Sequence, residues 1–209
     1  VIVVNFNGGD FVLECLASLR EQQAEGIELE TVVVDNASTD GSDRLIANQF
    51  PDVTLIHSDR NRGFAGGVNL ALRQTHGELV VLINNDAVAD PGFIQAITTP
   101  FRNGAQHLAA VTARIILSGQ FVPASAIDSA AYVSATGERW ARFPDDTPPG
   151  TGVVLVNSTG NQISRSGNGR DRSWLSLAQA DDSSTEVFGF CGGGAAIRRD
   201  AGGGAGSSD

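Results

Sequence analysis

Short apolar runs recur along the first half of the chain, separated by segments in which apolar side chains have a helical spacing. Each run has the length and the β-branched composition of a strand that is buried on both faces, as in a parallel sheet. We therefore expect strands over residues 1–5, 31–34, 53–57, 79–83 and 109–117.

Helices are expected between these runs. Phe11, Cys15 and Leu19 follow one another at helical spacing, Ser42 stands at an N-cap position, and Pro91 suits a first helical turn. The expected helices cover residues 11–22, 44–50, 65–76 and 93–101. This alternation predicts an α/β fold with a mostly parallel sheet flanked by helices, of the Rossmann-like kind.

The second half of the chain has a different pattern. Periodicity fades from residue 118 to residue 186, where Ser, Gly, Asp and Pro are frequent, and strand-like composition returns over 187–190. A long irregular segment inside a compact domain is either functional or poorly ordered. We divide the chain into an α/β part, 1–117, and an irregular part of the same domain, 118–209, whose small residues 201–209 are expected to be mobile.

Composition narrows the function classes. The formal net charge of −10 argues against a nucleic-acid partner but leaves metal ions and small phosphorylated ligands open. Cys15 and Cys191 show no metal-ligand spacing and no disulfide framework, so we expect a buried free thiol at Cys15 and a cytoplasmic location. No apolar run has the length of a membrane span. Because the chain opens inside an expected strand and contains no Met, we expect both ends to be cut.

Polar side chains follow the expected strands at their carboxyl ends, in segments 5–7, 35–38, 58–63 and 84–86. Ligands of open α/β sheets bind at this edge. Turn chemistry alone would supply some of these Asn, Asp and Gly residues. Since all four strand ends carry them, we predict a shared ligand crevice.

Two acids and one Gly-rich segment in this crevice suit particular ligands. Asp35 can accept hydrogen bonds from a nucleobase or ribose, although an Asx turn or a helix cap is the alternative. Segment 61–67 opens a helix and could direct N–H groups at an anion, but it is not a Walker loop, and Gly8-Gly9 after the first strand does not form a dinucleotide fingerprint. Asp86, after the most apolar strand, suits Mg²⁺ or Mn²⁺, with a cap or turn acid as the alternative.

Four blocks, 3–7, 33–42, 61–69 and 82–86, resemble in order and spacing the family 2 glycosyltransferases of GT-A fold, and most closely their bacterial rhamnosyltransferase-like members. A fifth block, 189–200, resembles the Gly-rich acceptor-side segment of that family. The resemblance implies a nucleotide-sugar-binding half, 1–117, and an acceptor-side region, 118–209, that is truncated at its C-terminus.

The resemblance also implies roles for individual residues. Asp86 would bind the divalent metal, Mn²⁺ or Mg²⁺, and Asn84 stands where many relatives carry another Asp. The acceptor would contact Cys191, Gly192, Gly193 and Trp174, although Trp174 could equally be a core anchor. The donor would contact Asn5, Asn7, Asp35, Asn36, Ser38, Asn61, Gly63, Phe64, Ala65, Gly66, Asn69, Asn84 and Asn85.

The activity that the resemblance implies is inverting transfer of a sugar, rhamnose being one candidate, from a nucleotide-sugar donor to a glycan or lipid-linked acceptor. The setting would be cell-wall or polysaccharide synthesis. The full-length protein could associate peripherally with the inner face of the membrane. The family's general base would lie beyond Asp209, so we expect this chain to bind donor and to transfer poorly. The alternatives are a non-catalytic nucleotide-sugar-binding relative and a sugar nucleotidyltransferase.

Overall fold

The computed structural model describes residues 1–102, 107–125, 131–180 and 186–202. It divides the chain into two compact units, one of Val1–Val111 with Gly192–Asp209 and one of Thr112–Cys191. Each unit is described by itself below. No helix in the described ranges is long and apolar enough to cross a membrane.

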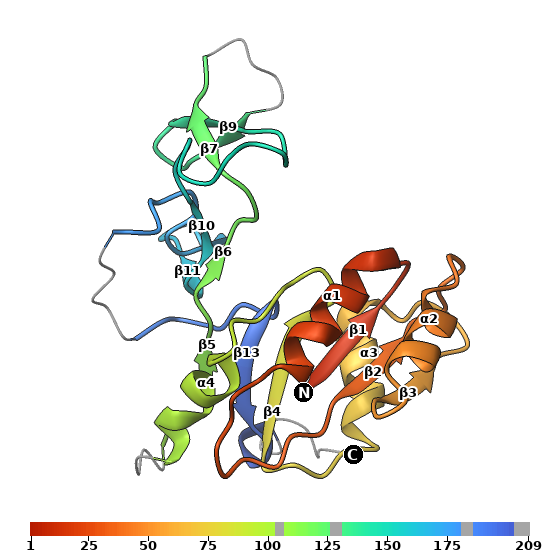
Figure 1. The fold of residues 1–209 in the computed structure, drawn as a ribbon. Helices are drawn as coiled ribbons and strands as arrows, with labels where there is room; N and C mark the ends of the chain where they lie inside the picture. The colour runs from red at the N-terminus through yellow and green to blue at the C-terminus, as the bar shows by residue number, and fades with distance from the viewer. Residues whose placement is uncertain (103–106, 126–130, 181–185, 203–209) are drawn as a thin grey trace. The chain divides into compact units, whose positions relative to one another are not determined.

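The first unit is an α/β layer structure around a six-stranded sheet with the order β3-β2-β1-β4-β13-β5 (Figure 1). Strands β1 to β4 pair in parallel, and β13 is antiparallel to β4. The strands are β1 Ile2–Asn5, β2 Val32–Asp35, β3 Thr54–His57, β4 Leu79–Asn84, β5 Ala110–Thr112 and β13 Gly194–Arg198. The predicted α/β fold with a mostly parallel sheet is confirmed.

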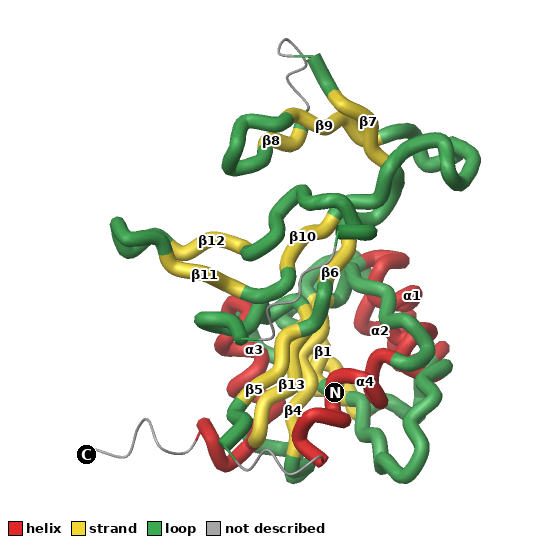
Figure 2. Tube along the Cα trace, turned by 90° about the vertical axis from the view of Figure 1, so that its left-hand side faces the viewer, coloured by secondary structure: helices red, strands yellow, loops and turns green. Residues whose placement is uncertain are grey.

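Four helices cover the two faces of this sheet. They are α1 Gly9–Arg20, α2 Ser42–Gln49, α3 Gly63–Leu72 and α4 Phe93–Arg102. Figure 2 shows α3 on one side of the sheet and the other three helices on the opposite side. A short 3₁₀ helix, η1 Arg199–Gly202, follows β13.

Alternate residues of the same strands build two separate cores, as the period of a strand requires. Val3, Val33 and Ile83 face α1 and α2 in one buried cluster, whereas Ile2 and Val34 face α3 in the other. Every side chain of β2 is buried, which explains its continuous run of valines. The sheet is therefore covered on both faces and opens to ligands only at its edges.

Helix α3 packs closely on β1 through a glycine. A Cβ atom at Gly67 would lie 2.7 Å from Cγ1 of Val4, closer than side chains tolerate, so a larger residue would push the helix away. This close packing fixes the position of the α3 N-terminus beside the carboxyl ends of β1 and β2.

The second unit consists of short antiparallel strands with a small core. Phe121, Leu155 and Leu175 are buried in it, and Trp140 and Trp174 pack against them. Strands β7, β9 and β8 form one sheet, β6 pairs with β10, and β11 pairs with β12. They are β6 Ile115–Ile116, β7 Phe121–Pro123, β8 Tyr132–Val133, β9 Arg139–Arg142, β10 Val156–Ser158, β11 Asn161–Ile163 and β12 Gly169–Asp171.

Three expectations about the second half need correction. The stretch 118–186 contains strands, which were missed because runs of two to four residues are too short to show a period. The expected strand over 109–117 is two strands, β5 and β6. The strand expected over 187–190 is absent from these described positions apart from a single bridge at Gly189, and the strand lies instead at Gly194–Arg198. Of the segment 201–209, residues 203–209 lie outside the described residues.

The predicted burial of Cys15 is confirmed, and it leads to a chemical prediction. Cys15 is fully buried, burial raises the pKa of its thiol to about 12, and the nearby Asp86 charge acts in the same direction. Because only the thiolate reacts, Cys15 should resist a thiol reagent at pH 8, whereas the partly exposed Cys191 should react. Ellman titration should count one thiol in the native protein and two in guanidinium; two fast native thiols would contradict this burial.

Candidate functional site

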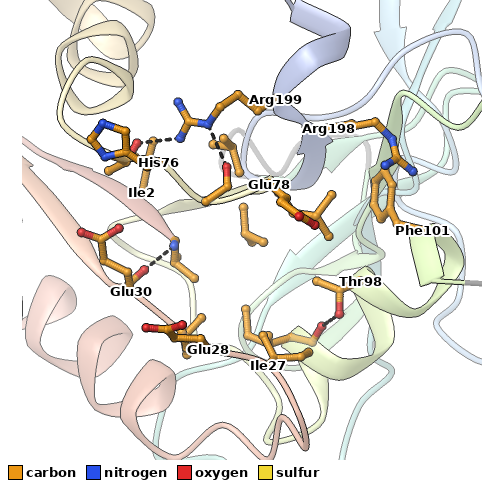
Figure 3. Close-up of a pocket in the computed structure, with 18 of the residues that line it drawn as sticks. Ile2, Ile27, Glu28, Glu30, His76, Glu78, Thr98, Phe101, Arg198 and Arg199 are labelled. Carbon is orange, nitrogen blue, oxygen red and sulfur yellow. Dashed lines mark hydrogen bonds between the residues drawn. The ribbon is translucent and has the colours of Figure 1, made fainter. Parts of the chain in front are cut away.

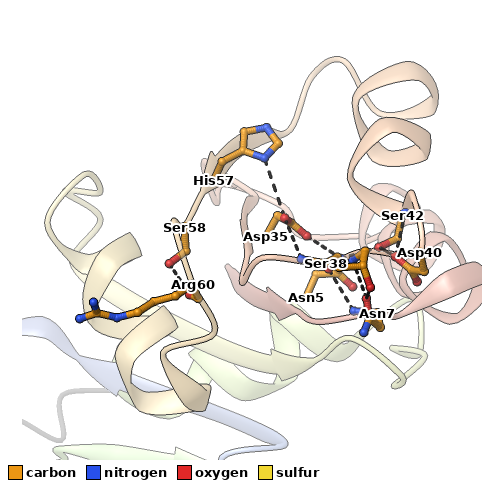
Figure 4. A network of polar contacts seen from close by, with 10 residues as sticks. Asn5, Asn7, Asp35, Ser38, Asp40, Ser42, His57, Ser58 and Arg60 are labelled. Atoms are coloured by element: carbon orange, nitrogen blue, oxygen red, sulfur yellow. Dashed lines mark hydrogen bonds and ion pairs between the residues drawn. The ribbon is translucent and has the colours of Figure 1, made fainter.

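The polar strand ends predicted from the sequence meet at one edge of the sheet. Strand β1 lies between β2 and β4, and Asn5 is paired with Asp35 and Val4 with Asn84 across the two junctions. The carboxyl ends of these three neighbouring strands therefore lie side by side, and Figure 4 shows the polar residues at the β1 and β2 ends. Strand β3 contributes its last residue, His57, at the same edge.

Asn5 is the centre of this edge. Its side chain is fully buried, and its Nδ2 lies 3.2 Å from Oδ1 of Asp35, 3.2 Å from Oγ of Ser38 and 2.9 Å from Oγ of Ser42. Its Oδ1 accepts a hydrogen bond of 3.2 Å from Nδ2 of Asn85. Because its polar atoms are all engaged inside the protein, Asn5 orients the residues around it.

Asp35 is a buried acid with spare accepting capacity. Only 4% of its surface is exposed, and its Oδ2 accepts a long 3.3 Å bond from the Ser38 N–H and lies 3.9 Å from Nδ1 of His57. A carboxylate offers about four accepting positions, so these contacts do not saturate it. A ligand with N–H or O–H donors can therefore bond to Asp35.

The loops after β1 and β2 are fastened to each other. Asp40 accepts hydrogen bonds from the N–H of Gly9 at 2.9 Å and from the N–H and hydroxyl of Ser42 at 3.0 and 2.6 Å. The Ser42 hydroxyl contributes most to holding the pKa of the Asp40 carboxyl below its usual value. Asn7, with a φ of 52°, accepts from the Thr39 N–H at 2.8 Å. The β1 and β2 loops thus form one rigid wall.

A second pair of amides fastens the β2 loop to the start of α3. Nδ2 of Asn36 donates to Oδ1 of Asn61 at 3.0 Å and to the carbonyl of Gly63 at 3.2 Å. Oδ1 of Asn36 accepts from the N–H of Arg62 at 2.9 Å, and Oδ1 of Asn61 accepts from that of Gly63 at 2.8 Å. These two backbone N–H groups bond within the protein and do not face an anion.

Phe64 and Ala65 occupy the exposed first turn of α3. The Phe64 ring lies against the Gly-rich segment, since a Cβ atom at Gly192 would be 3.1 Å from Cε1 of that ring. In the second unit, the N–H of Cys191 donates to Oγ1 of Thr112 at 3.1 Å. The predicted acceptor residue Gly192 is thus in contact with the predicted donor residue Phe64.

The β4 end carries the predicted metal ligand. Asp86 is exposed, and within the described ranges its carboxylate makes no hydrogen bond and belongs to no group of three or more acidic, His or Cys residues that could hold a metal. The backbone of Asn84 is engaged on both sides, by the Gly193 carbonyl at 3.2 Å and by Sγ of Cys15 at 3.4 Å. Asn85 points back to Asn5, so among the described residues of the β4 end the carboxylate of Asp86 and the exposed amide of Asn84 are free to bind a ligand.

Trp174 has the contacts of a core anchor. Its Nε1 donates to the carbonyl of Val133 at 3.1 Å, its ring lies 6.3 Å from the Tyr132 ring, and it packs against the Phe121 cluster. A contact with the acceptor stays a prediction for this residue.

Two features of this edge were missed from the sequence. A Cβ atom at Gly8 would lie 2.4 Å from Oδ1 of Asn5 and 2.7 Å from Nδ2 of Asn85, so only glycine fits there. Phe6, between Asn5 and Asn7, is 46% exposed and offers an aromatic face at the crevice. The signal for both was their position directly after the first strand.

Two hollows lie away from this edge. One of about 970 Å³ lies at the opposite edge of the sheet, near Ile2, Glu30, Glu78 and Arg199 (Figure 3), and contains none of the predicted site residues. The other, of about 380 Å³, lies on the flank of α3 and includes Asn61, Gly66 and Asn69. These three predicted donor residues therefore line a hollow that is separate from the carboxyl-end edge of the sheet.

The fold and this edge define an α/β protein with clustered polar side chains at the carboxyl ends of its parallel strands. Residues 1–201 match the family model of glycosyl transferase family 2, and the chain belongs to that family. The family match selects a transferase over the sugar nucleotidyltransferase that the sequence left open. Its fold is of the GT-A type.

Individual relatives are bacterial and longer. The chain is 34% identical over 92 residues to the succinoglycan biosynthesis protein ExoO of Rhizobium meliloti. The matched residues make up 43% of this chain and 26% of ExoO. It is 35% identical over 89 residues to the poly(ribitol-phosphate) beta-N-acetylglucosaminyltransferase TarS of Staphylococcus aureus. Here the matched residues make up 41% of this chain and 16% of TarS.

A structural similarity extends over more of the chain. Residues 1–349 of S. aureus TarS, solved in complex with UDP, resemble it with a TM-score of 0.50 and 25% identity, covering 62% of this chain and 39% of that one. The chain thus spans much less than two thirds of the relatives that it matches.

Proposed function

We propose that this chain is the donor-binding part of an inverting glycosyltransferase that moves a sugar from a nucleotide-sugar donor to a glycan or lipid-linked acceptor. The observation that carries the proposal is the meeting of Asp35, Asn85 and Asp86 at the carboxyl ends of three neighbouring strands around the buried Asn5. A TarS structure that holds UDP supports a nucleotide-linked donor. The names of ExoO and TarS support a role in polysaccharide or cell-wall polymer synthesis.

The parts of the donor have separate places in this proposal. Asp35 accepts hydrogen bonds from the base or ribose, and Phe6 supplies an aromatic face beside it. The wall formed by Asn7, Ser38 and Asp40 keeps this end of the crevice rigid, so little order is lost on binding. Rhamnose as the transferred sugar is the most specific part of the proposal, and it is supported only by the resemblance of the motifs.

The described residues fit a metal that is shared with the donor better than a metal held by the protein alone. Mn²⁺ and Mg²⁺ commonly bind one or two carboxylates and complete their shell with substrate phosphates. Asp86 is such a free carboxylate, whereas an all-protein site would need a cluster that the described part of the chain lacks. When bound, the metal would neutralise charge on the departing diphosphate. Asp86 would hold it, and Asn84 would add at most a weaker amide ligand.

The transfer step needs one more group. A general base must deprotonate the acceptor hydroxyl within hydrogen-bond reach. The acceptor is assigned to the region after residue 117, together with the Gly192–Gly193 turn that contacts Phe64.

Calorimetric titration tests the donor site. UDP, dTDP and GDP are added in turn, each with and without Mn²⁺, and circular dichroism verifies the fold. We expect one nucleotide to bind preferentially, and at least tenfold more tightly with Mn²⁺ than without it. If folded protein bound none of the three, the donor-site proposal would be wrong. Steady release of free sugar from a donor would separate an active site from a binding-only relative.

A further inference from the structure

The hollow on the flank of α3 is lined almost entirely by hydrogen-bond donors. Five of its residues, 62, 66, 69, 70 and 73, recur at helical spacing and form one stripe along the helix, with Arg60 beside its start. The volume is about 380 Å³. The lining residues are Arg60, Asn61, Arg62, Gly66, Asn69, Leu70 and Arg73.

Three guanidinium groups gather here without an acid among the lining residues. Arg62 is held in place, since its Nε donates to Oγ of Ser58 at 2.9 Å and its Nη2 lies 2.5 Å from Oδ1 of Asp59. The Arg62 bond is the main reason that the pKa of Asp59 is lowered, so this acid is already paired. Arg60 and Arg73 are exposed, and their side chains make no ion pair or hydrogen bond with any described residue.

Such a gathering is unusual in a chain with a net charge of −10. Like charges repel, and the neighbouring acid Asp59, which bonds to Arg62 and attracts Arg60, offsets only part of the charge of three guanidiniums, so a further anion would be favourable. A guanidinium presents a planar set of donors that matches the oxygens of a phosphate. The exposed amide of Asn69 adds two further N–H donors, and the amide N–H groups of Asn61 remain free because its bonds use Oδ1.

We propose that this hollow binds a phosphoryl group of a ligand other than the nucleotide donor. The donor crevice lies at the N-terminal end of α3, whereas Arg73 follows its last residue, roughly 15 Å further along the helix axis. In Figure 4 the Arg60 side chain points away from the network of Asp35 and Asn5. The inference uses neither Asp86 nor the buried network, and it assigns Asn61, Gly66 and Asn69, which the family resemblance places at the donor, to this second ligand.

The phosphoryl group has two chemical sources, a soluble phosphorylated molecule or a phospholipid headgroup, and the test separates them. Inorganic pyrophosphate is titrated calorimetrically into the protein in EDTA, so that no metal can recruit it to Asp86. The same protein is also sedimented with phosphatidylcholine vesicles, with and without phosphatidylglycerol. The double variant Arg60→Gln/Arg73→Gln is compared with Arg44→Gln/Arg165→Gln, which removes the same charge from two exposed arginines outside the hollow.

We expect pyrophosphate affinity to fall at least tenfold in the Arg60→Gln/Arg73→Gln protein and to change less than twofold in the other. Phosphatidylglycerol-dependent sedimentation that is lost in the same variant would identify the source as a headgroup. If the protein bound pyrophosphate but did not sediment with phosphatidylglycerol vesicles, the ligand would be a soluble phosphorylated molecule. All four substituted residues are exposed, so thermal unfolding should be unchanged. Equal affinity of both variants, or loss of binding in Asp86→Ala, would overturn the proposal.

Discussion

Replacing Asp86 with alanine is expected to weaken nucleoside diphosphate binding in Mn²⁺ at least tenfold, which corresponds to roughly 1.4 kcal/mol. Asp86 is the only free carboxylate that the described part of the β4 end offers. In the alanine variant, the metal would be bound only by donor phosphates and water. Calorimetry with and without Mn²⁺ separates the two contributions. Affinity without metal should hardly change, because Asp35 and the amide network are untouched.

Asp90→Ala is the matched control for this experiment. Asp90 is also exposed, belongs to the same loop, and accepts hydrogen bonds from Gln22 and Phe93 with its backbone carbonyl rather than its carboxylate. Its removal changes the charge of the protein equally, so a general electrostatic effect would appear in both variants. If Asp86→Ala kept the full Mn²⁺ enhancement, the metal would bind elsewhere and this assignment would be wrong.

Asn5→Ala should have the largest effect on stability, with a loss of about 2–4 kcal/mol in the free energy of unfolding. The change removes every amide contact to Asp35, Ser42 and Asn85, and it leaves a buried carboxylate with fewer donors. Urea unfolding measures the loss. Nucleotide affinity should fall as well, because Asp35 and Asn85 lose the group that orients them.

Asn48→Ala supplies the comparison, since Asn48 is an exposed residue of α2 and alanine is the better helix former. Its stability should stay within about 0.5 kcal/mol of the unchanged protein. A loss below about 1 kcal/mol for Asn5→Ala would show that the buried network is weaker than its geometry indicates.

The sequence predicted the parallel strands well because they are buried on both faces, and Val32–Asp35 is the clearest example. It missed β13 for a physical reason. Gly194, Ala195 and Ala196 have little strand propensity, and they are buried beside β4 because they are small, not because they are strongly apolar. A search for β-branched and aromatic residues therefore selects 187–190 instead.

The candidate site was predicted as a set of positions but not as a set of contacts. Asn5 and Asn85 were both named from motifs, yet their hydrogen bond joins residues 80 apart in the sequence, which no local pattern reveals. The stripe of Arg62, Asn69 and Arg73 did carry a local signal, namely helical spacing, but Arg60 joins it only through the fold. Which residues play which role stays a prediction for the donor, acceptor and metal.

The pairing of β13 beside β5 has a consequence for how this protein can change over evolution. The second unit leaves the sheet at Thr112 and returns at Cys191, whose N–H bonds to Oγ1 of that same threonine. Because the two ends of this segment adjoin, a change in its length alters the entropy of loop closure only slightly. The 112–191 segment can therefore be lengthened, shortened or exchanged while the six-stranded sheet is kept intact.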